Sequence, residues 1–423
     1  MASDKPFSRK RQTEIFLGSL RGKNKTIPVS FDKLRTIAKK KMSKEAYAYI
    51  DGAAGREITK KSNRSDFNQW KIVPSMLNDV STCNTEISLF GRHYPVPFLL
   101  APIGVLDMAH PEADLAVAKA SAAEDIPFIF SSQASVDMET CSSVMGNSPR
   151  WFQLYWSTSD DLVESFVRRA ESCGCEAIVL TLDTTMLGWR PRDLDLNYLP
   201  FLRGRGIAQY TSDPVFRELM KTSLGDADEP PKLTWESIKA LIKMAQNYPG
   251  GFWGNLLSDD PRRAVKTFIE CYSRPSLTWE DLSFLRSLTD LPILLKGILN
   301  ANDARKAIER DMDGIIVSNH GGRQVDGAVS AIEVLPDIAE EINGDIPLLM
   351  DSGIRSGSDM FKAIALGADA VLLGRPYTYA LAIAGKQGVQ EIIQNYPADF
   401  ELTMTLSGCK SVHEINANRL QSV

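Results

Sequence analysis

The sequence contains few cysteines and no long apolar segment, and each shortage excludes a class of protein. Six cysteines are scattered over 423 residues, and only Cys173 and Cys175 lie close together. This spacing fits neither a disulfide framework nor a zinc site, so we expect reduced thiols and no bound metal. No apolar run approaches the roughly 20 residues of a membrane-spanning helix, so no segment is expected to cross a bilayer.

The chain also lacks a strong charge of either sign. Its formal net charge is −5 and its pI is about 5.6, which gives no overall attraction to nucleic acid or to an anionic membrane. The first residues lack the apolar core of a secretory signal, and the last three do not form a peroxisomal signal. We therefore expect a cytoplasmic protein with no nucleic-acid partner and no membrane partner.

Eight short apolar runs recur along the chain, each followed by polar residues and then by a segment with helical periodicity. Strands too apolar to alternate must be covered on both faces, which is typical of a parallel sheet between helices. Eight such units predict an α/β fold, a closed (β/α)8 TIM barrel. The runs are 97–101, 127–131, 151–155, 177–183, 292–296, 314–318, 347–350 and 370–374.

The spacing of these units predicts the domain organisation. Residues 1–90 form an N-terminal helical segment packed on the barrel, residues 91–400 the barrel itself, and residues 401–423 a C-terminal helical tail. The chain between the fourth and fifth strands is far longer than one helix and two loops require. We therefore predict an insertion at 190–275 after strand 4, which forms a partly ordered lid over the mouth of the barrel.

The segment Ser318 to Gln324, with sequence SNHGGRQ, follows the sixth apolar run. It is expected where a barrel strand opens onto the catalytic face. A histidine exchanges protons near neutral pH, and an arginine three residues later can hold a carboxylate through two parallel hydrogen bonds. His320 and Arg323 therefore indicate proton abstraction from an anionic substrate.

Polar residues also follow the other strands, and together they suggest a phosphate site. Residues 351–357 and 374–375 combine glycines with Arg355 and Arg375, and barrels often bind phosphate after strands 7 and 8. The phosphate alone does not identify the ligand. Lys296, at the end of the fifth strand, could form a Schiff base or hold a fixed positive charge beside a developing anion.

Taken together, these residues resemble the family of FMN-dependent 2-hydroxy acid oxidases and dehydrogenases. The resemblance runs from about Phe31 to Ile415, and the SNHGGRQ segment is highly specific to the family. Within it, residues 188–195, the long insertion and residues 102–105 look most like lactate 2-monooxygenase. The resemblance implies oxidation of a short-chain L-2-hydroxy acid with O2, with L-lactate giving acetate, CO2 and water.

Two alternatives stay open. The chain could be a lactate or glycolate type of 2-hydroxy acid oxidase that releases the keto acid and H2O2. More remotely, it could be a flavin-free phosphate-binding barrel, a lyase or isomerase that uses Lys296. The resemblance also implies a homotetramer or a larger homo-oligomer.

The resemblance assigns catalytic roles to four residues. His320 would be the base, and Asp183 would stabilise the imidazolium that results. Tyr155 would hydrogen-bond the substrate. Lys296 would lie at the N1–C2=O edge of the flavin ring, which displaces the Schiff-base interpretation.

Substrate and cofactor contacts follow from the same resemblance. Arg190 and Arg323 would hold the substrate carboxylate, although Arg192 is close enough in sequence to compete. Tyr49 would hydrogen-bond the substrate, with Tyr47 as its rival. The predicted FMN contacts are Pro102, Ile103, Gly104, Ser131, Gln153, Thr181, Lys296, Ser318, Asp351, Gly353, Arg355, Gly374 and Arg375.

Two positions support the monooxygenase interpretation. Several oxidases of the family have an aromatic residue where this chain has Gln133, and alanine where it has Gly104. Both differences match the monooxygenase pattern. A lid that retains the keto acid next to peroxide would favour its decarboxylation.

Overall fold

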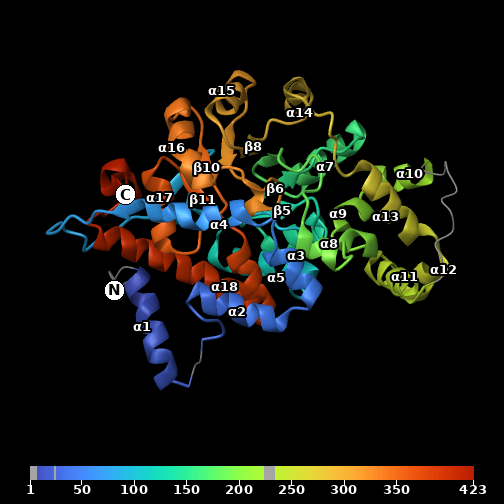
Figure 1. Cartoon of the computed structure of the whole chain (residues 1–423), viewed down its shortest axis with the longest axis horizontal. Coiled ribbons are helices and arrows are strands. Elements are labelled where there is room, and N and C mark those ends of the chain that lie inside the picture. The colour runs from blue at the N-terminus through green and yellow to red at the C-terminus, as the bar shows by residue number, and fades with distance from the viewer. Residues whose placement is uncertain (1–6, 23–24, 223–233) are drawn as a thin grey trace.

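The computed structural model describes residues 7–22, 25–222 and 234–423 and has a closed barrel of eight parallel strands (Figure 1). Around the barrel the strand order is β10-β11-β4-β5-β6-β7-β8-β9. Each of the eight predicted apolar runs forms one strand, so the predicted fold class is confirmed. The strands are β4 (Phe98–Leu100), β5 (Phe128–Ser131), β6 (Arg150–Leu154), β7 (Ile178–Thr181), β8 (Ile293–Ile298), β9 (Gly314–Val317), β10 (Leu348–Met350) and β11 (Ala370–Leu373).

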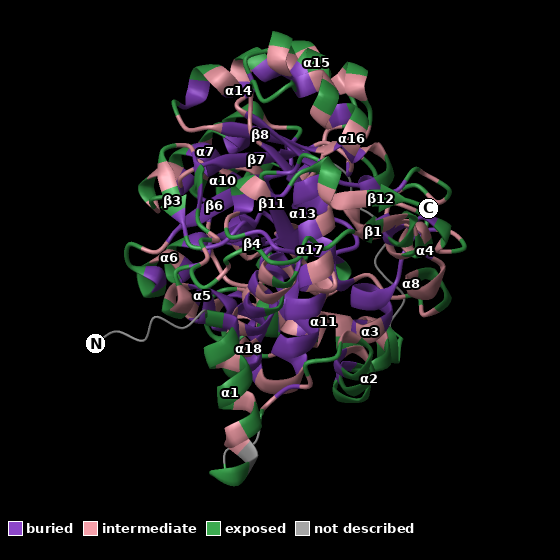
Figure 2. Cartoon of the chain, turned by 90° about the vertical axis from the view of Figure 1, so that its left-hand side faces the viewer, coloured by how far each residue is buried: buried purple, intermediate pink, exposed green. Residues whose placement is uncertain are grey.

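The barrel strands form the centre of the core. Every residue of β4, β5, β6, β7, β9, β10 and β11 is buried, and β8 has only Gly297 at intermediate burial. Figure 2 shows the buried residues gathered on the strands, with exposed residues on the outer helices. Because both faces are covered, the strands carry no alternation of apolar and polar residues, as expected for a parallel barrel.

Helices follow the strands on the outside of the barrel. Several begin at a residue whose side chain accepts a backbone N–H of the first turn, for example Asp137 before α6 and Asn300 before α15. The barrel helices are α5 (Ala113–Glu124), α6 (Met138–Met145), α7 (Asp160–Ser172), α14 (Leu282–Leu288), α15 (Ala301–Glu309), α16 (Ala331–Ile342), α17 (Gly357–Ala365) and α18 (Arg375–Leu406).

The N-terminal segment packs on α18 and reaches the catalytic end of the barrel. It contains α1 (Phe7–Leu20), α2 (Phe31–Lys41), α3 (Lys44–Asp51), α4 (Ile58–Ser65) and a 3-10 turn, and then the short strands β1 (Trp70–Ile72), β2 (Ile87–Leu89) and β3 (Arg92–Tyr94). Figure 1 shows α2 alongside α18 and α1 projecting from the body. The segment after α3 lies against the SNHGGRQ loop, because the backbone N–H of Ala54 donates to the carbonyl oxygen of Gly322 at 2.9 Å.

The predicted C-terminal helical tail is wrong beyond Leu406. Helix α18 ends there because Gly408 adopts a left-handed φ of 79°, which terminates the helix. Two 3-10 turns follow, and then β12 (Leu420–Ser422), which pairs antiparallel with β1. A short two-stranded sheet therefore joins residues 70–72 to the last residues of the chain.

The insertion after β7 is a helical unit with its own aromatic core. Tyr210 lies at its centre, with ring centroids 4.8 Å from Phe268, 5.5 Å from Phe216 and 5.0 Å from Phe166 of α7. The helices are α8 (Pro191–Asp195), α9 (Ala208–Thr211), α10 (Pro214–Thr222), α11 (Trp235–Asn247), α12 (Phe252–Leu257) and α13 (Asp260–Cys271), with a 3-10 turn at Pro200–Arg203.

The insertion reaches both α7 and the pocket. Figure 1 shows α10 to α13 together at the right of the molecule, and α10 contacts α7. The described part of the insertion contributes Arg190, Phe201 and Tyr272 to the pocket lining. The base of the insertion therefore forms part of the pocket wall, and its role as a lid stays a prediction.

Within the described ranges, no helix combines the length and apolarity needed to cross a membrane. The same ranges contain no group of three or more His, Cys, Asp or Glu residues that could hold a metal ion. All six cysteines are free thiols.

Candidate active site

A pocket occupies the carboxyl ends of the barrel strands. It encloses about 1080 Å³, including solvent at its mouth. Segments far apart in the sequence meet there because the ends of parallel strands converge on one face. Its lining comprises Tyr49, Ile50, Ala101, Pro102, Ile103, Gly104, Ser131, Gln133, Tyr155, Thr184, Leu187, Arg190, Phe201, Tyr272, Lys296, His320, Gly321, Arg323, Asp351, Ser352, Gly353, Ile354, Arg355, Leu372, Gly374, Arg375 and Thr378.

His320 and Asp183 form a hydrogen-bonded pair in this pocket. The Nδ1 atom of His320 lies 2.7 Å from Oδ1 of Asp183, and the hydroxyl of Thr184 donates to the same oxygen at 2.9 Å. His320 has a left-handed φ of 56°. Gly322 lies two residues after His320, and a side-chain carbon at that position would lie 2.6 Å from the backbone nitrogen of Lys60. Only glycine therefore lets the loop pass beneath α4.

The environment keeps the imidazole neutral and the carboxylate ionised near pH 7. Burial lowers the pKa of His320 below its usual 6.5, and Asp183 opposes this effect in part. Burial acts to raise the pKa of Asp183, but His320 and Lys296 together lower it to about 2. A neutral imidazole whose other nitrogen faces an ionised carboxylate is suited to accept a proton and to hold the charge that follows.

Lys296 lies in a cluster of polar groups below His320. Its Nζ donates to Oγ of Ser318 at 2.9 Å and lies 3.3 Å from Oδ2 of Asp351 and 3.9 Å from Oδ2 of Asp183. Burial acts to lower the pKa of Lys296, but the carboxylates of Asp351 and Asp183 outweigh it and raise the pKa. A charged ammonium is a poor nucleophile, so this environment favours the fixed-charge role over the Schiff-base role.

Arg190 and Arg323 face the pocket without a carboxylate partner. In the described part of the chain, both guanidinium groups donate only to neutral acceptors: Arg190 to the carbonyl of Arg323 at 3.2 Å and to Gln324 Oε1 at 3.0 Å, and Arg323 to the carbonyls of Tyr49 and Gly52. Burial, followed by the charge of Arg323, lowers the pKa of Arg190 to about 10. Two adjacent cations, one buried and one half-buried, form a site for an anion.

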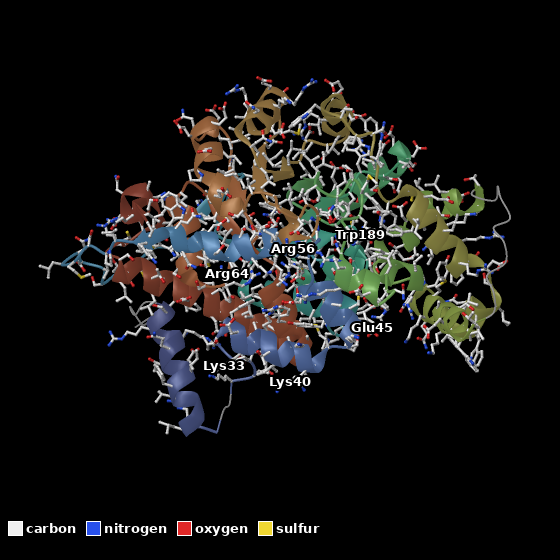
Figure 3. The ribbon with its side chains drawn as sticks, in the orientation of Figure 1. Lys33, Lys40, Glu45, Arg56, Arg64 and Trp189 are labelled. Atoms are coloured by element: carbon white, nitrogen blue, oxygen red, sulfur yellow. The ribbon has the colours of Figure 1, made fainter. Side chains whose placement is uncertain are left out.

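The structure distinguishes Arg190, which lines the pocket, from the competing candidate Arg192. Arg192 is turned away from the pocket, and its guanidinium forms ion pairs with Asp51 at 2.8 Å and Glu57 at 2.6 Å. Trp189, labelled in Figure 3, is 73% exposed, whereas the neighbouring Arg190 is only 6% exposed.

The structure also distinguishes Tyr49, which lines the pocket, from the competing candidate Tyr47. Tyr49 lines the pocket, with the guanidinium carbon of Arg323 4.7 Å from its ring centroid. Tyr47, its rival, is not among the lining residues and instead has the ammonium of Lys39 over its ring. Tyr155 lines the pocket from the end of β6, and burial raises its pKa, so its hydroxyl stays protonated.

Two further arginines define a second anion subsite at the ends of β10 and β11. Arg375 donates to the carbonyl oxygens of Ile50, Gly52 and Gly321, and Arg355 donates to that of Ile354. Neither forms an ion pair with a carboxylate in the ranges that the structure describes. Burial lowers the pKa of Arg375 to about 10 and also lowers that of Arg355. A phosphate would supply the missing negative charge.

Four predicted contacts lie just below the pocket surface rather than on it: Gln153, Thr181, Asp183 and Ser318. Gln153 accepts from the hydroxyl of Ser131 at 3.1 Å, but its amide nitrogen has no hydrogen-bond partner, and neither does the hydroxyl of Thr181. Buried polar atoms are rarely left unpaired. These two therefore fit a polar heterocycle such as the FMN ring, which the sequence predicts at this place.

Several pocket residues were not predicted from the sequence. Thr184 was missed although it follows Asp183 directly. Phe201 and Tyr272 come from the insertion, where aromatic composition was the available signal. Gln324 lies outside the pocket lining and was noted only as part of its motif, but it contacts the loop that carries Arg190.

Comparison with known proteins agrees with this geometry. The family described as FMN-dependent dehydrogenase matches residues 38–422. The chain is 39% identical over 385 residues to an L-lactate oxidase of Lysinibacillus sphaericus, with 91% of this chain and 90% of the relative covered. It is 38% identical to an FMN-dependent alpha-hydroxy acid dehydrogenase of Schizosaccharomyces pombe, with 96% and 94% covered. It is 35% identical to a 4-hydroxymandelate oxidase of Amycolatopsis orientalis, with 91% and 96% covered.

Solved structures give the same picture. A crystal structure of mandelate oxidase with (S)-4-hydroxymandelic acid matches with a TM-score of 0.76 and 34% identity, covering 93% of this chain and 98% of that one. The relatives named here are oxidases and a dehydrogenase. The expected likeness to lactate 2-monooxygenase therefore gains no support from them.

Proposed function

Because this chain belongs to the family of FMN-dependent 2-hydroxy acid dehydrogenases and oxidases, we propose that it oxidises a short-chain L-2-hydroxy acid with O2 and releases the 2-keto acid and H2O2. The observation that carries the proposal is the neutral His320, held by Asp183, beside the buried Arg190 and the half-buried Arg323, neither of which has a carboxylate partner in the described part of the chain. The oxidation removes two electrons and two protons from the substrate, and O2 receives them as H2O2.

FMN, when bound, supplies the electron acceptor for this oxidation and passes the electrons to O2. Arg355 and Arg375 would hold its phosphate. Lys296 would place a fixed positive charge beside the ring where negative charge gathers. Gln153 and Thr181 would satisfy their unpaired polar atoms on the ring edge.

The chain's own residues then bind the substrate and move its proton. Arg190 and Arg323 would hold the substrate carboxylate, and Tyr49 and Tyr155 would hydrogen-bond its polar groups. His320 would accept a proton at Nε2 while Nδ1 remains bonded to Asp183. Asp183, with its low pKa, would stay ionised and stabilise the imidazolium.

Release of the keto acid is favoured over its decarboxylation by the relatives, which include an L-lactate oxidase and a 4-hydroxymandelate oxidase. L-Lactate is the first substrate to test, because an L-lactate oxidase is 39% identical to this chain.

Anaerobic reduction of the purified holoenzyme tests the proposal. The flavin absorbance is followed with L-lactate, D-lactate, glycolate and (S)-mandelate, and the products are measured after air is admitted. We expect bleaching by L-lactate but not D-lactate, followed by equal amounts of pyruvate and H2O2. The His320→Gln variant should retain FMN but resist bleaching. Acetate in place of pyruvate would establish the decarboxylating reaction instead, and a flavin that no 2-hydroxy acid reduces would refute the proposal.

We further propose a cytoplasmic homo-oligomer of four or more chains. The free thiols of all six cysteines fit a reducing compartment. Light scattering of the holoenzyme measures the assembly, and a mass equal to one chain would exclude it.

A further inference from the structure

We propose that Gln324 is a positioning residue that holds together the two loops carrying the base and the carboxylate-binding arginines. One loop follows β7 and carries Asp183 and Arg190, and the other follows β9 and carries His320 and Arg323. The inference rests on the proposed function. Gln324 is not among the pocket-lining residues, so it would act through these four side chains rather than on the substrate.

The carboxamide of Gln324 makes four hydrogen bonds to the opposite loop. Its Nε2 donates to the carbonyl oxygens of Asp183 at 2.7 Å and Met186 at 2.9 Å. Its Oε1 accepts from the backbone N–H of Gly188 at 3.3 Å and from Nη2 of Arg190 at 3.0 Å. Both donors and both acceptor positions of the group are therefore in use.

The two loops are in close contact around this carboxamide. A side-chain carbon at Gly188 would lie 2.5 Å from the carbonyl oxygen of Arg323 and 2.9 Å from Cα of Gln324, so only glycine fits there. Nε of Arg190 also donates to the carbonyl oxygen of Arg323 at 3.2 Å. The loop after β7 therefore has little freedom to shift while Gln324 remains bonded to it.

Only a carboxamide can serve this position. A glutamate could accept from Gly188 and Arg190, but it could not donate to the carbonyls of Asp183 and Met186. A lysine could donate but not accept. Because Gln324 anchors the main chain of Asp183 and the guanidinium of Arg190, one side chain sets the distance between the base and the carboxylate site. Small displacements of such groups cost large factors in rate.

The test replaces Gln324 with methionine, which keeps the length of the side chain and removes all four hydrogen bonds. The matched control is Asn255→Leu, because Asn255 also bridges two carbonyls, those of Ala245 and Tyr248, but lies in the insertion away from the pocket. The measurements are kcat/KM, FMN content, and the Kd of oxalate, a dicarboxylate without an oxidisable α-hydrogen, from perturbation of the flavin spectrum. We expect Q324M to lose about tenfold in kcat/KM and in oxalate affinity. The control should match the wild type.

The pH profile of kcat/KM distinguishes positioning from a general loss of stability. The charged groups that face His320 are Asp183, Lys296 and Arg190, and Asp183 raises the pKa of the imidazole. If Q324M loosens Asp183, the acid limb of the profile should move to lower pH. A change confined to thermal stability would leave that limb in place and would overturn the proposal.

A second variant covers the case in which Q324M does not retain FMN. Q324E keeps the two acceptor contacts but loses the two donors, and its charge would pair with Arg190. We expect it to retain FMN and to bind oxalate at least tenfold more weakly. Oxalate affinity within twofold of the wild type in the FMN-loaded variant would refute the role of Gln324. Because oxalate binding needs no turnover, this measurement tests the role of Gln324 even if no 2-hydroxy acid reduces the flavin of the wild type.

Discussion

Replacing Arg190 with methionine should weaken catalysis without destabilising the protein. Arg190 is 6% exposed and has no carboxylate partner among the described residues. Its charge-assisted hydrogen bonds to a substrate carboxylate are expected to contribute about 1.5–3 kcal/mol. Their loss corresponds to a decrease in kcat/KM of roughly 10- to 100-fold.

The effect on stability should have the opposite sign. Burial and Arg323 lower the pKa of Arg190 from 12.5 to about 10, which corresponds to a cost of about 3 kcal/mol for holding the charge in the folded apoprotein. Methionine removes that cost but also removes the hydrogen bonds to Arg323 and Gln324, which contribute about 1 kcal/mol each. We therefore expect the unfolding free energy of the apoprotein to be unchanged or slightly higher.

Arg192→Met is the matched control, because it removes the same side chain two residues away. Arg192 pairs with Asp51 and Glu57, and its side chain is 37% exposed, so solvent screening limits the loss of unfolding free energy to about 1 kcal/mol. Its oxalate Kd should match the wild type. The measurements are steady-state kinetics, oxalate titration and guanidinium unfolding of the apoprotein. If R192M lost oxalate affinity while R190M kept it, the assignment of the carboxylate site would be refuted.

Two further predictions concern the base and the phosphate subsite. Burial lowers the pKa of His320 below 6.5, and the base must be neutral to accept a proton. We therefore expect kcat/KM to fall only on the acid side of pH 6.5. A midpoint above 6.5 in the pH–rate profile would contradict this expectation. Arg375→Met should raise the Kd of FMN at least about tenfold, because it removes a charge-assisted phosphate contact; fluorescence titration of the apoprotein measures this, and an unchanged Kd would remove Arg375 from the phosphate site.

The barrel and the residues at its mouth could be predicted from the sequence because the pattern is local. The residues of β9 and β11 are too apolar to alternate, and both strands lie within the apolar runs predicted at 314–318 and 370–374. Once eight strands are recognised, parallel order places the ends of all strands on one face. The polar residues after each strand are then the candidates for the site.

What failed depends on contacts between distant segments. The pairing of β1 with β12 joins Trp70 to Ser422, and strands of three residues carry no periodicity that could reveal it. The placement of the insertion depends on Tyr210 meeting Phe166 of α7, a contact that composition alone cannot indicate. Spacing alone could not separate Arg190, which the resemblance favours, from Arg192, because the difference depends on where Asp51 and Glu57 lie in space.

The cations of this fold fall into two groups: those that pair with the carboxylate of Asp51, and the arginines that line the pocket. Asp51, buried in α3, is contacted by Arg35, Lys60 and Arg192 at 2.8 to 3.2 Å, and hydrogen bonds and ion pairs with these cations lower its pKa despite its burial. Where this chain buries a carboxylate in its structure, it therefore surrounds that carboxylate with cations.

The four pocket arginines are handled differently. Arg190, Arg323, Arg355 and Arg375 donate to carbonyl or amide oxygens, which orient the guanidinium groups without neutralising them. An uncompensated charge in the protein interior is destabilising, so a fold that surrounds the buried Asp51 with cations would also gain stability from carboxylates beside these arginines. We therefore expect ligands to supply the missing negative charges. The grouping of the arginines in two pairs predicts two anions: a carboxylate beside His320 and a phosphate at the ends of β10 and β11.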